Sequence, residues 1–173
     1  MALPVNTGLI LRHLKPHLTP NEDYSVGVVD GVVYVNWRSV EQQPTEQQII
    51  DAELAAVRAE FIVAVKSTAS NKYSQYASSA PGKDAVYAAK QSEAVQYGID
   101  ATVGPYMQAR INKTGEPATA IAAEWSAKSA AWNALAVQID AIQDNATQQI
   151  NAAATVAECE TIANAAIAEI EAL

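Results

Sequence analysis

The chain has little of several residue types on which common functions depend. It has one cysteine, Cys159, so an intramolecular disulfide and a cysteine-based metal cluster are excluded. It carries 19 acidic and 11 basic residues, which give a formal net charge of -8. Phosphate backbones are bound by clustered lysine and arginine, and the chain has no basic stripe. We therefore expect no nucleic-acid partner.

Long apolar runs are also missing. Its apolar runs, such as residues 62–65 and 152–154, are far too short to span a bilayer, so we expect no membrane partner. The first 14 residues lack the basic segment, apolar core and cleavage site of a signal peptide. We therefore expect the protein to be cytoplasmic when it is made.

Motifs for catalysis and metal binding are absent too. His13 and His17 have the spacing of ligands on one helix face, but Pro16 lies between them and would break that helix. The sequence has no glycine-rich phosphate loop, no nucleophile elbow and no paired His-Glu motif. Cys159 lies among alanines and is read as a small packing residue. We predict that the protein is not an enzyme and has no catalytic, cofactor-binding or metal-binding residues.

The clearest local pattern is in residues 24–37. Two runs rich in valine and aromatic residues flank Asp30-Gly31, a pair that tolerates the positive φ angles of a type I′ turn. This pattern predicts a β-hairpin. An isolated hairpin is marginal in water, so it must pack on a helix, pair with a third strand or join a neighbouring subunit. We expect Tyr34 and Trp37 on its second strand to be the docking residues.

The rest of the chain predicts helices, since half of its residues are apolar and alanine, with 35 residues, is the most frequent of them. The predicted fold is mainly α, with an N-terminal β-hairpin module and a long alanine-rich amphipathic C-terminal helix or helical hairpin. We divide it into a hairpin module at 1–44, a helical middle region at 45–116, and a long helix plus terminal helix at 117–173.

Local signals place the helix ends. A short helix is expected around 8–14, and a capping box at Thr45 and Gln48 opens a helix that should end near 66–70. A further helix is expected over 83–97, where Gly98 suits the residue after a helix end, and another over 105–112 behind Pro105.

The long helix carries an apolar seam that organises the chain. With Ala146 included and Lys128 filling one gap, its members recur at steps of three and four, the period of one helix face. We expect these residues to form an interface with a second copy or a partner protein: Ile121, Trp125, Trp132, Leu135, Ile139, Ile142 and Ile150. The alternative is that the seam packs within its own chain. A second capping box, Thr155 with Glu158, favours a break at 152–155 that would let the terminal helix fold back, although one continuous helix competes.

Three stretches in this order resemble small proteins of tailed bacteriophages that are encoded among tail-fibre and baseplate genes. The first is the aromatic-bearing hairpin followed by Pro44-Thr45-Glu46 and a helix that begins Ile49-Ile50-Asp51. The second is 80–90, which begins Ala-Pro-Gly-Lys-Asp, and the third is 122–132, which contains Glu-Trp-Ser-Ala-Lys. The resemblance implies a virion or virion-assembly protein of the tail, without catalysis.

Together, seam and resemblance lead to two functional hypotheses. The first is a structural tail protein, located in the virion, that forms a homo-oligomer and docks to tail-fibre or baseplate proteins. A trimer is favoured because the resemblance implies threefold fibres. The second is a tail-fibre assembly chaperone, made in the host cytoplasm, that binds the fibre through the edge of its hairpin together with Trp37 and does not stay in the virion.

Overall fold

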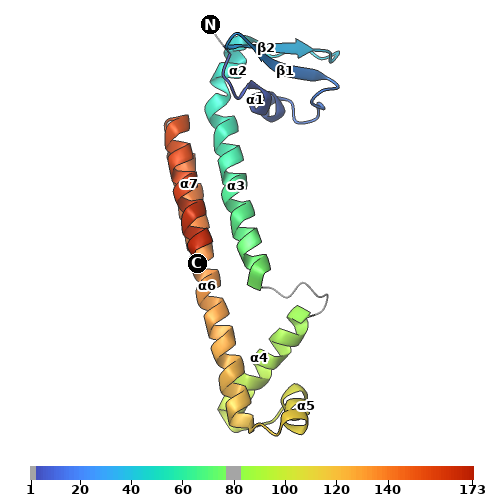
Figure 1. The fold of residues 1–173 in the computed structure, drawn as a ribbon, viewed down its shortest axis with the longest axis vertical. Helices are drawn as coiled ribbons and strands as arrows, with labels where there is room; N and C mark the ends of the chain where they lie inside the picture. Colours follow the sequence, from blue (N-terminus) through green and yellow to red (C-terminus); the bar gives the residue numbers. More distant parts are fainter. Residues whose placement is uncertain (1–2, 77–82) are drawn as a thin grey trace. The chain divides into compact units, whose positions relative to one another are not determined.

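The computed structural model describes residues 3–76 and 83–173 of the 173-residue chain. These form two compact units, Met1–Lys66 with Asn145–Ala168, and Ser67–Asp144 with Glu169–Leu173. The elements, drawn in Figure 1, are α1 (Thr7–Leu14), β1 (Tyr24–Val29), β2 (Val32–Trp37), α2 (Glu46–Asp51), α3 (Glu53–Tyr76), α4 (Lys83–Asp100), α5 (Pro105–Thr114), α6 (Ala118–Ala152) and α7 (Val156–Ala172). The predicted fold class, mainly helical with an N-terminal hairpin, is confirmed.

The first unit contains the hairpin. Strands β1 and β2 pair antiparallel from Tyr24 opposite Trp37 to Val29 opposite Val32. Asp30 and Gly31 connect them with φ angles of 48° and 77°, the left-handed conformation that a type I′ turn requires. The predicted hairpin and turn are therefore confirmed.

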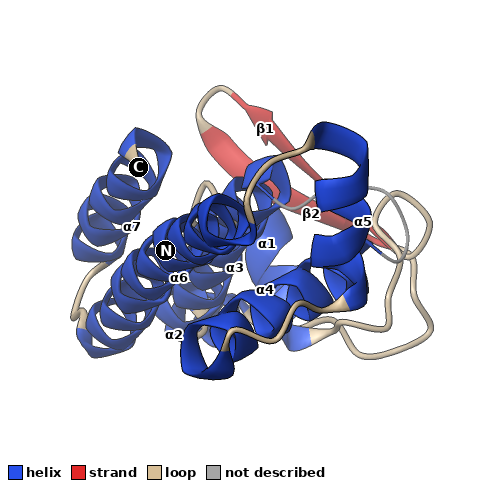
Figure 2. Ribbon diagram, turned by 90° about the horizontal axis from the view of Figure 1, so that it is seen from below, coloured by secondary structure: helices blue, strands red, loops and turns tan. Residues whose placement is uncertain are grey.

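The predicted break in the long C-terminal helix is confirmed as well. Helix α6 ends at Ala152 and α7 begins at Val156. The Glu158 N–H donates to the Thr155 hydroxyl at 3.2 Å, and the Glu158 carboxylate accepts from the Thr155 N–H at 3.2 Å. In the first unit the end of α6 lies beside α7 (Figure 2). The buried Cys159 thiol lies 3.9 Å from the Ile150 carbonyl, so this cysteine is a packing residue.

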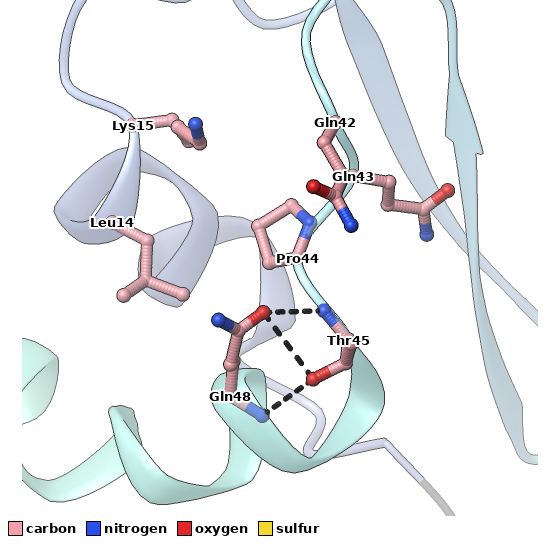
Figure 3. Close-up of a pocket in the computed structure, with 7 residues that line it drawn as sticks. All are labelled: Leu14, Lys15, Gln42, Gln43, Pro44, Thr45 and Gln48. Carbon is pink, nitrogen blue, oxygen red and sulfur yellow. Dashed lines mark hydrogen bonds between the residues drawn. The ribbon is translucent and has the colours of Figure 1, made fainter.

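A capping box also starts α2, as predicted. The Thr45 hydroxyl accepts from the Gln48 N–H at 3.2 Å, and the Gln48 side chain accepts from the Thr45 N–H at 2.9 Å (Figure 3). These bonds satisfy backbone groups that a helix start otherwise leaves unpaired. They fix the start of α2, whose Ile49 belongs to the hydrophobic cluster that packs against the hairpin.

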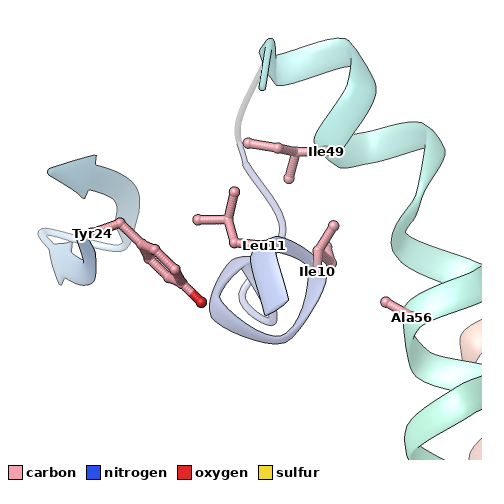
Figure 4. Packing of buried hydrophobic residues seen from close by; sticks show 5 residues of the cluster. All are labelled: Ile10, Leu11, Tyr24, Ile49 and Ala56. Carbon is pink, nitrogen blue, oxygen red and sulfur yellow. The ribbon is translucent and has the colours of Figure 1, made fainter. Parts of the chain in front are cut away.

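That cluster is the core of the N-terminal part. Its buried members come from α1, β1, α2 and α3 and are Ile10, Leu11, Tyr24, Ile49 and Ala56 (Figure 4). The hairpin contributes Val26, Val35 and Trp37 as partly buried neighbours. Because the two strands bury one face here, α1 and α2 supply the support that an isolated hairpin lacks.

In the second unit, α4, α5 and α6 share a smaller core made of Ala94, Met107, Ile121, Ala122 and Trp125. The Glu93 carboxylate on α4 accepts from the Tyr106 and Met107 N–H groups at 3.0 and 2.8 Å and so caps the start of α5. A Cβ atom at Gly104 would lie 2.3 Å from the Glu93 carboxyl carbon, so this cap requires glycine there.

An ion-pair network ties α5 to α6. The Arg110 guanidinium bonds Glu116 at 2.7 Å and Glu124 at 2.5 Å, and the Lys128 ammonium bonds Glu124 at 2.5 Å. Hydrogen bonds from Arg110 and then from Lys128 lower the pKa of Glu124 from 4.5 to about 2. Glu124 therefore stays ionised well below the ordinary range of a glutamate.

Two predicted helix ends are wrong. Helix α3 does not end near 66–70 but continues to Tyr76, because side chains of its last turns are bonded within the second unit. The nearly buried Lys72 ammonium donates to the Glu171 carbonyl at 3.0 Å, and the Tyr73 hydroxyl donates to Asp140 at 2.6 Å. These bonds outweigh the weak helix propensity of the serine and asparagine there. The rest of the expected polar connection, 77–82, lies outside the described residues.

Gly98 does not end its helix. Helix α4 continues to Asp100, and the left-handed residue is Ala101, with φ 58°. The Ala101 N–H closes on the Tyr97 carbonyl at 2.9 Å, and the Asp100 carboxylate accepts from the Thr102 N–H at 2.9 Å. A carboxylate that caps the turn thus replaces the expected glycine. Within 3–76 and 83–173, no helix has the length and apolar character needed to cross a membrane.

The cap at Thr155 gives a first prediction. Replacement Thr155→Ala should lower the free energy of unfolding by about 1 kcal/mol, because the Glu158 N–H loses its acceptor. Urea denaturation measures the change. Thr161→Ala is the matched control, since that hydroxyl donates to Ala157 inside α7 and caps nothing. An equal loss in both variants would contradict the role of the cap.

The ion-pair network at Glu124 gives a second prediction. The Glu124 carboxyl has a lower pKa in the folded protein than in the unfolded one. Its contribution to the free energy of unfolding is therefore present above pH 4.5 and is lost as the pH falls from about 4.5 towards 2. Glu124→Gln should therefore flatten the acid side of a stability-against-pH curve measured by urea denaturation. Glu60→Gln, at an exposed position on α3, is the control. If stability fell with decreasing pH equally steeply in the wild type and in Glu124→Gln, the network would not be a source of acid-sensitive stability.

Candidate docking surface

The two faces of the hairpin differ in what covers them. Pairs Tyr24–Trp37, Val26–Val35 and Val28–Val33 alternate with pairs Ser25–Asn36, Gly27–Tyr34 and Val29–Val32. Successive side chains of a strand point to opposite faces, so the first set forms an inner face and the second an outer face. The inner face packs against the core of α1 and α2, through Tyr24, Val26, Val35 and Trp37.

Trp37, one of the two expected docking residues, is bound within the chain. Its ring stacks on Tyr24 with centroids 5.8 Å apart and planes 18° apart, and its Nε1 donates to the Glu41 carbonyl at 2.8 Å. An indole with a buried face and a bonded N–H holds the base of the hairpin to the core. In this structure Trp37 therefore serves as an anchor of the hairpin.

Beside Trp37, the Glu41 carboxylate contacts a lysine and a histidine side chain. The Lys15 ammonium bonds one oxygen at 2.9 Å and the His17 Nε2 lies 2.6 Å from the other. Hydrogen bonds from Lys15, and then from His17, lower the pKa of Glu41. His17 thus contacts a carboxylate, and the described residues contain no group of three or more His, Cys, Asp or Glu side chains that could hold a metal ion.

The outer face is apolar and open at the hairpin tip. We call Val29, Val32 and Tyr34 the hairpin patch; they are 57%, 58% and 48% exposed. Tyr34 lies across Gly27, where an added Cβ would come within 2.3 Å of the phenolic oxygen. Val29 and Val32 are cross-strand partners. The patch is therefore one continuous apolar surface, and it contains the second expected docking residue.

The seam on α6 is partly covered by its own chain. Four of its members are buried: Ile121, Trp125, Ile139 and Ile150. Lys90 on α4 lies over the Trp125 ring, 5.6 Å from its centroid. These residues are not accessible to a partner without a rearrangement of the helices.

The other seam residues remain partly exposed. Leu135 and Ile142 are half-buried, and Trp132 is 37% exposed. The Trp132 ring meets Tyr73 edge-on at 5.8 Å. Burial, and then the hydrogen bond to Asp140, raise the pKa of Tyr73 to about 12. The accessible part of the seam is thus a narrow strip around Trp132.

Of the three residues of the hairpin patch, only Tyr34 was predicted from the sequence to dock. Val29 and Val32 were not expected to dock, although the turn at Asp30-Gly31 fixes the pairing and alternation then assigns every side chain to a face. Comparisons with protein-family models, curated proteins and solved structures found no match for this chain. The docking surface is therefore inferred from the exposed residues of the hairpin and the seam in this chain alone.

The turn that shapes the patch gives a third prediction. Asp30→Ala should destabilise the hairpin by roughly 1 kcal/mol, because alanine tolerates positive φ less well than aspartate. Asp30→Gly, which adopts that angle freely, is the control. Backbone NMR shifts of 24–37 report the hairpin, and far-UV circular dichroism reports the helices. Large helix loss in Asp30→Ala would show that hairpin and helices are not separable.

Proposed function

We propose that this chain is a structural component of a bacteriophage tail, associated with the tail fibre or baseplate, and that it docks to a neighbouring tail protein through the hairpin patch. The observation that carries the proposal is the exposure of Val29, Val32 and Tyr34 as one apolar surface on a supported hairpin. The tail assignment itself comes from the resemblance of the three sequence stretches to small tail proteins.

The chemistry of the patch favours a protein partner. Large apolar side chains that are contiguous on a surface are typical of interaction sites, whereas single ones are common everywhere. The three residues carry no charge in a chain whose formal net charge is -8. A neutral apolar surface on an acidic protein avoids repulsion at the contact, while the acidic remainder keeps the protein soluble.

Self-association through the seam is the other half of the proposal. Because four seam residues are buried, a homo-oligomer has to use the strip of Trp132, Leu135 and Ile142. Trp132 supplies the largest side chain in that strip, and aromatic residues are enriched at the centres of interfaces. The preference for a trimer comes from the resemblance alone.

The alternative is a tail-fibre assembly chaperone that leaves before the virion is complete. The same hairpin serves this function, since a two-stranded sheet can accept an additional strand from an unfinished fibre. Quantitative mass spectrometry of purified particles distinguishes the two. Peptides at a fixed stoichiometry support the structural component, and their absence from particles despite expression in infected cells supports the chaperone.

Variants of the patch give a fourth prediction. The double replacement Val32→Thr with Tyr34→Thr keeps a strand-forming residue at each position but removes two of the three apolar side chains of the hairpin patch, so incorporation into particles should fall at least about tenfold. Quantitative mass spectrometry measures the incorporation. Val137→Thr, at an α6 position that is 68% exposed, is the control and should not change it. Normal incorporation of a folded double variant would contradict the docking role.

A further inference from the structure

A hollow of about 430 Å³ lies between α1 and β1 in the first unit, within the range of ligand pockets, roughly 300–1,000 Å³. Its walls include Asn6, Gly8 and Arg12 from the α1 side and Tyr24, Val26 and Val28 from β1, and none of its lining residues comes from β2. Since β2 pairs with the other side of β1, the hollow lies along the open edge of that strand.

The open edge offers backbone hydrogen bonds to a new strand. In a two-residue hairpin the residues that flank the turn bond to each other, and the pattern then alternates along the strands. Val29 and Val32 flank the turn, so the N–H and C=O groups of Val26 and Val28 point away from β2. Such a row of backbone groups is a template for strand addition.

One end of the hollow is covered by a neighbouring segment and lies near a cation, since the exposed Arg12 acts electrostatically on Tyr24. The Asn21 N–H donates to the Tyr24 carbonyl at 2.7 Å, so the segment Pro20–Asn21 covers the edge at that end. Arg12 is the one charged residue that lines the hollow, and the described residues form no ion pair with it. The Tyr24 hydroxyl is buried without a hydrogen-bond partner, in a side chain that is 2% exposed. A guanidinium and an unpaired hydroxyl together suit a carboxylate.

We infer that this hollow binds the C-terminal segment of a neighbouring protein as an extended strand antiparallel to β1, with its terminal carboxylate at Arg12 and Tyr24. An antiparallel strand ends at the Tyr24 end of β1, so its carboxylate meets the cation. A parallel strand would instead place its amino terminus at the closed end, beside Arg12. Valine side chains along β1 make the hollow suited to a strand with β-branched residues on the face towards α1.

The β1 strand of a second copy of this chain is a poorer candidate to bind in this hollow. That strand, Tyr24–Val29, carries no acidic side chain to meet Arg12. The inference deepens the proposed docking function, because it assigns the partner a free, extended C-terminus, and it uses the strand edge, which is distinct from the outer-face patch.

The probe is a fluorescent hexapeptide of alternating threonine and valine with a free C-terminal carboxylate, and its counterpart is the same peptide ending in an amide. Both are titrated onto the full-length protein, with binding followed by fluorescence anisotropy and by ¹⁵N amide shifts. We expect the acid to bind at least about tenfold more tightly than the amide, with shifts at Val26 and Val28.

Three variants test the geometry. Arg12→Glu should abolish the difference between acid and amide, whereas Lys66→Glu, the same charge change at an exposed α3 position, should preserve it. Val28→Pro removes an edge N–H without removing a bond to β2 and should weaken both peptides. No binding, equal binding of acid and amide, or an unchanged difference in Arg12→Glu would overturn the inference. If Val32→Thr with Tyr34→Thr still prevents incorporation into particles, the proposed function stands while this inference fails.

Discussion

Two paired strands alone are only marginally stable in water, and the packing of the N-terminal part of this protein compensates for that. Tyr24 and Trp37 stack across the base of the hairpin, and Ile10, Leu11 and Ile49 pack with them and with Val26 and Val35 of its inner face. This support covers one face and leaves the outer face and the β1 edge open. The same packing that makes the hairpin stable thus creates the surfaces that we propose for docking.

Local signals predicted much of the fold, because they act over a few residues. The Asp30-Gly31 turn and the capping boxes at Thr45 and Thr155 all formed as expected, since each satisfies backbone geometry or hydrogen bonds within one turn. The break at Thr155 decided between a continuous helix and a helical hairpin. The placement of Pro105 and Gly115 around α5 follows the same local rules.

Features that depend on distant residues were not predictable in this way. The extension of α3 depends on bonds from Lys72 and Tyr73 to groups about 60 to 100 positions further along the chain. The seam was visible as a period, but the period does not say whether its partner is the same chain or another copy. The structure places Trp125 and Ile139 in the interior and leaves Trp132 partly exposed.

The central claim is that the outer face of the hairpin holds this protein to a neighbour in an assembled phage tail. A cryo-electron microscopy reconstruction of purified tails tests it most directly. We predict density for this chain in which Val29, Val32 and Tyr34 lie against a different protein. Density that leaves these three side chains in solvent while the chain is held elsewhere, or tails that lack the chain, would contradict the claim.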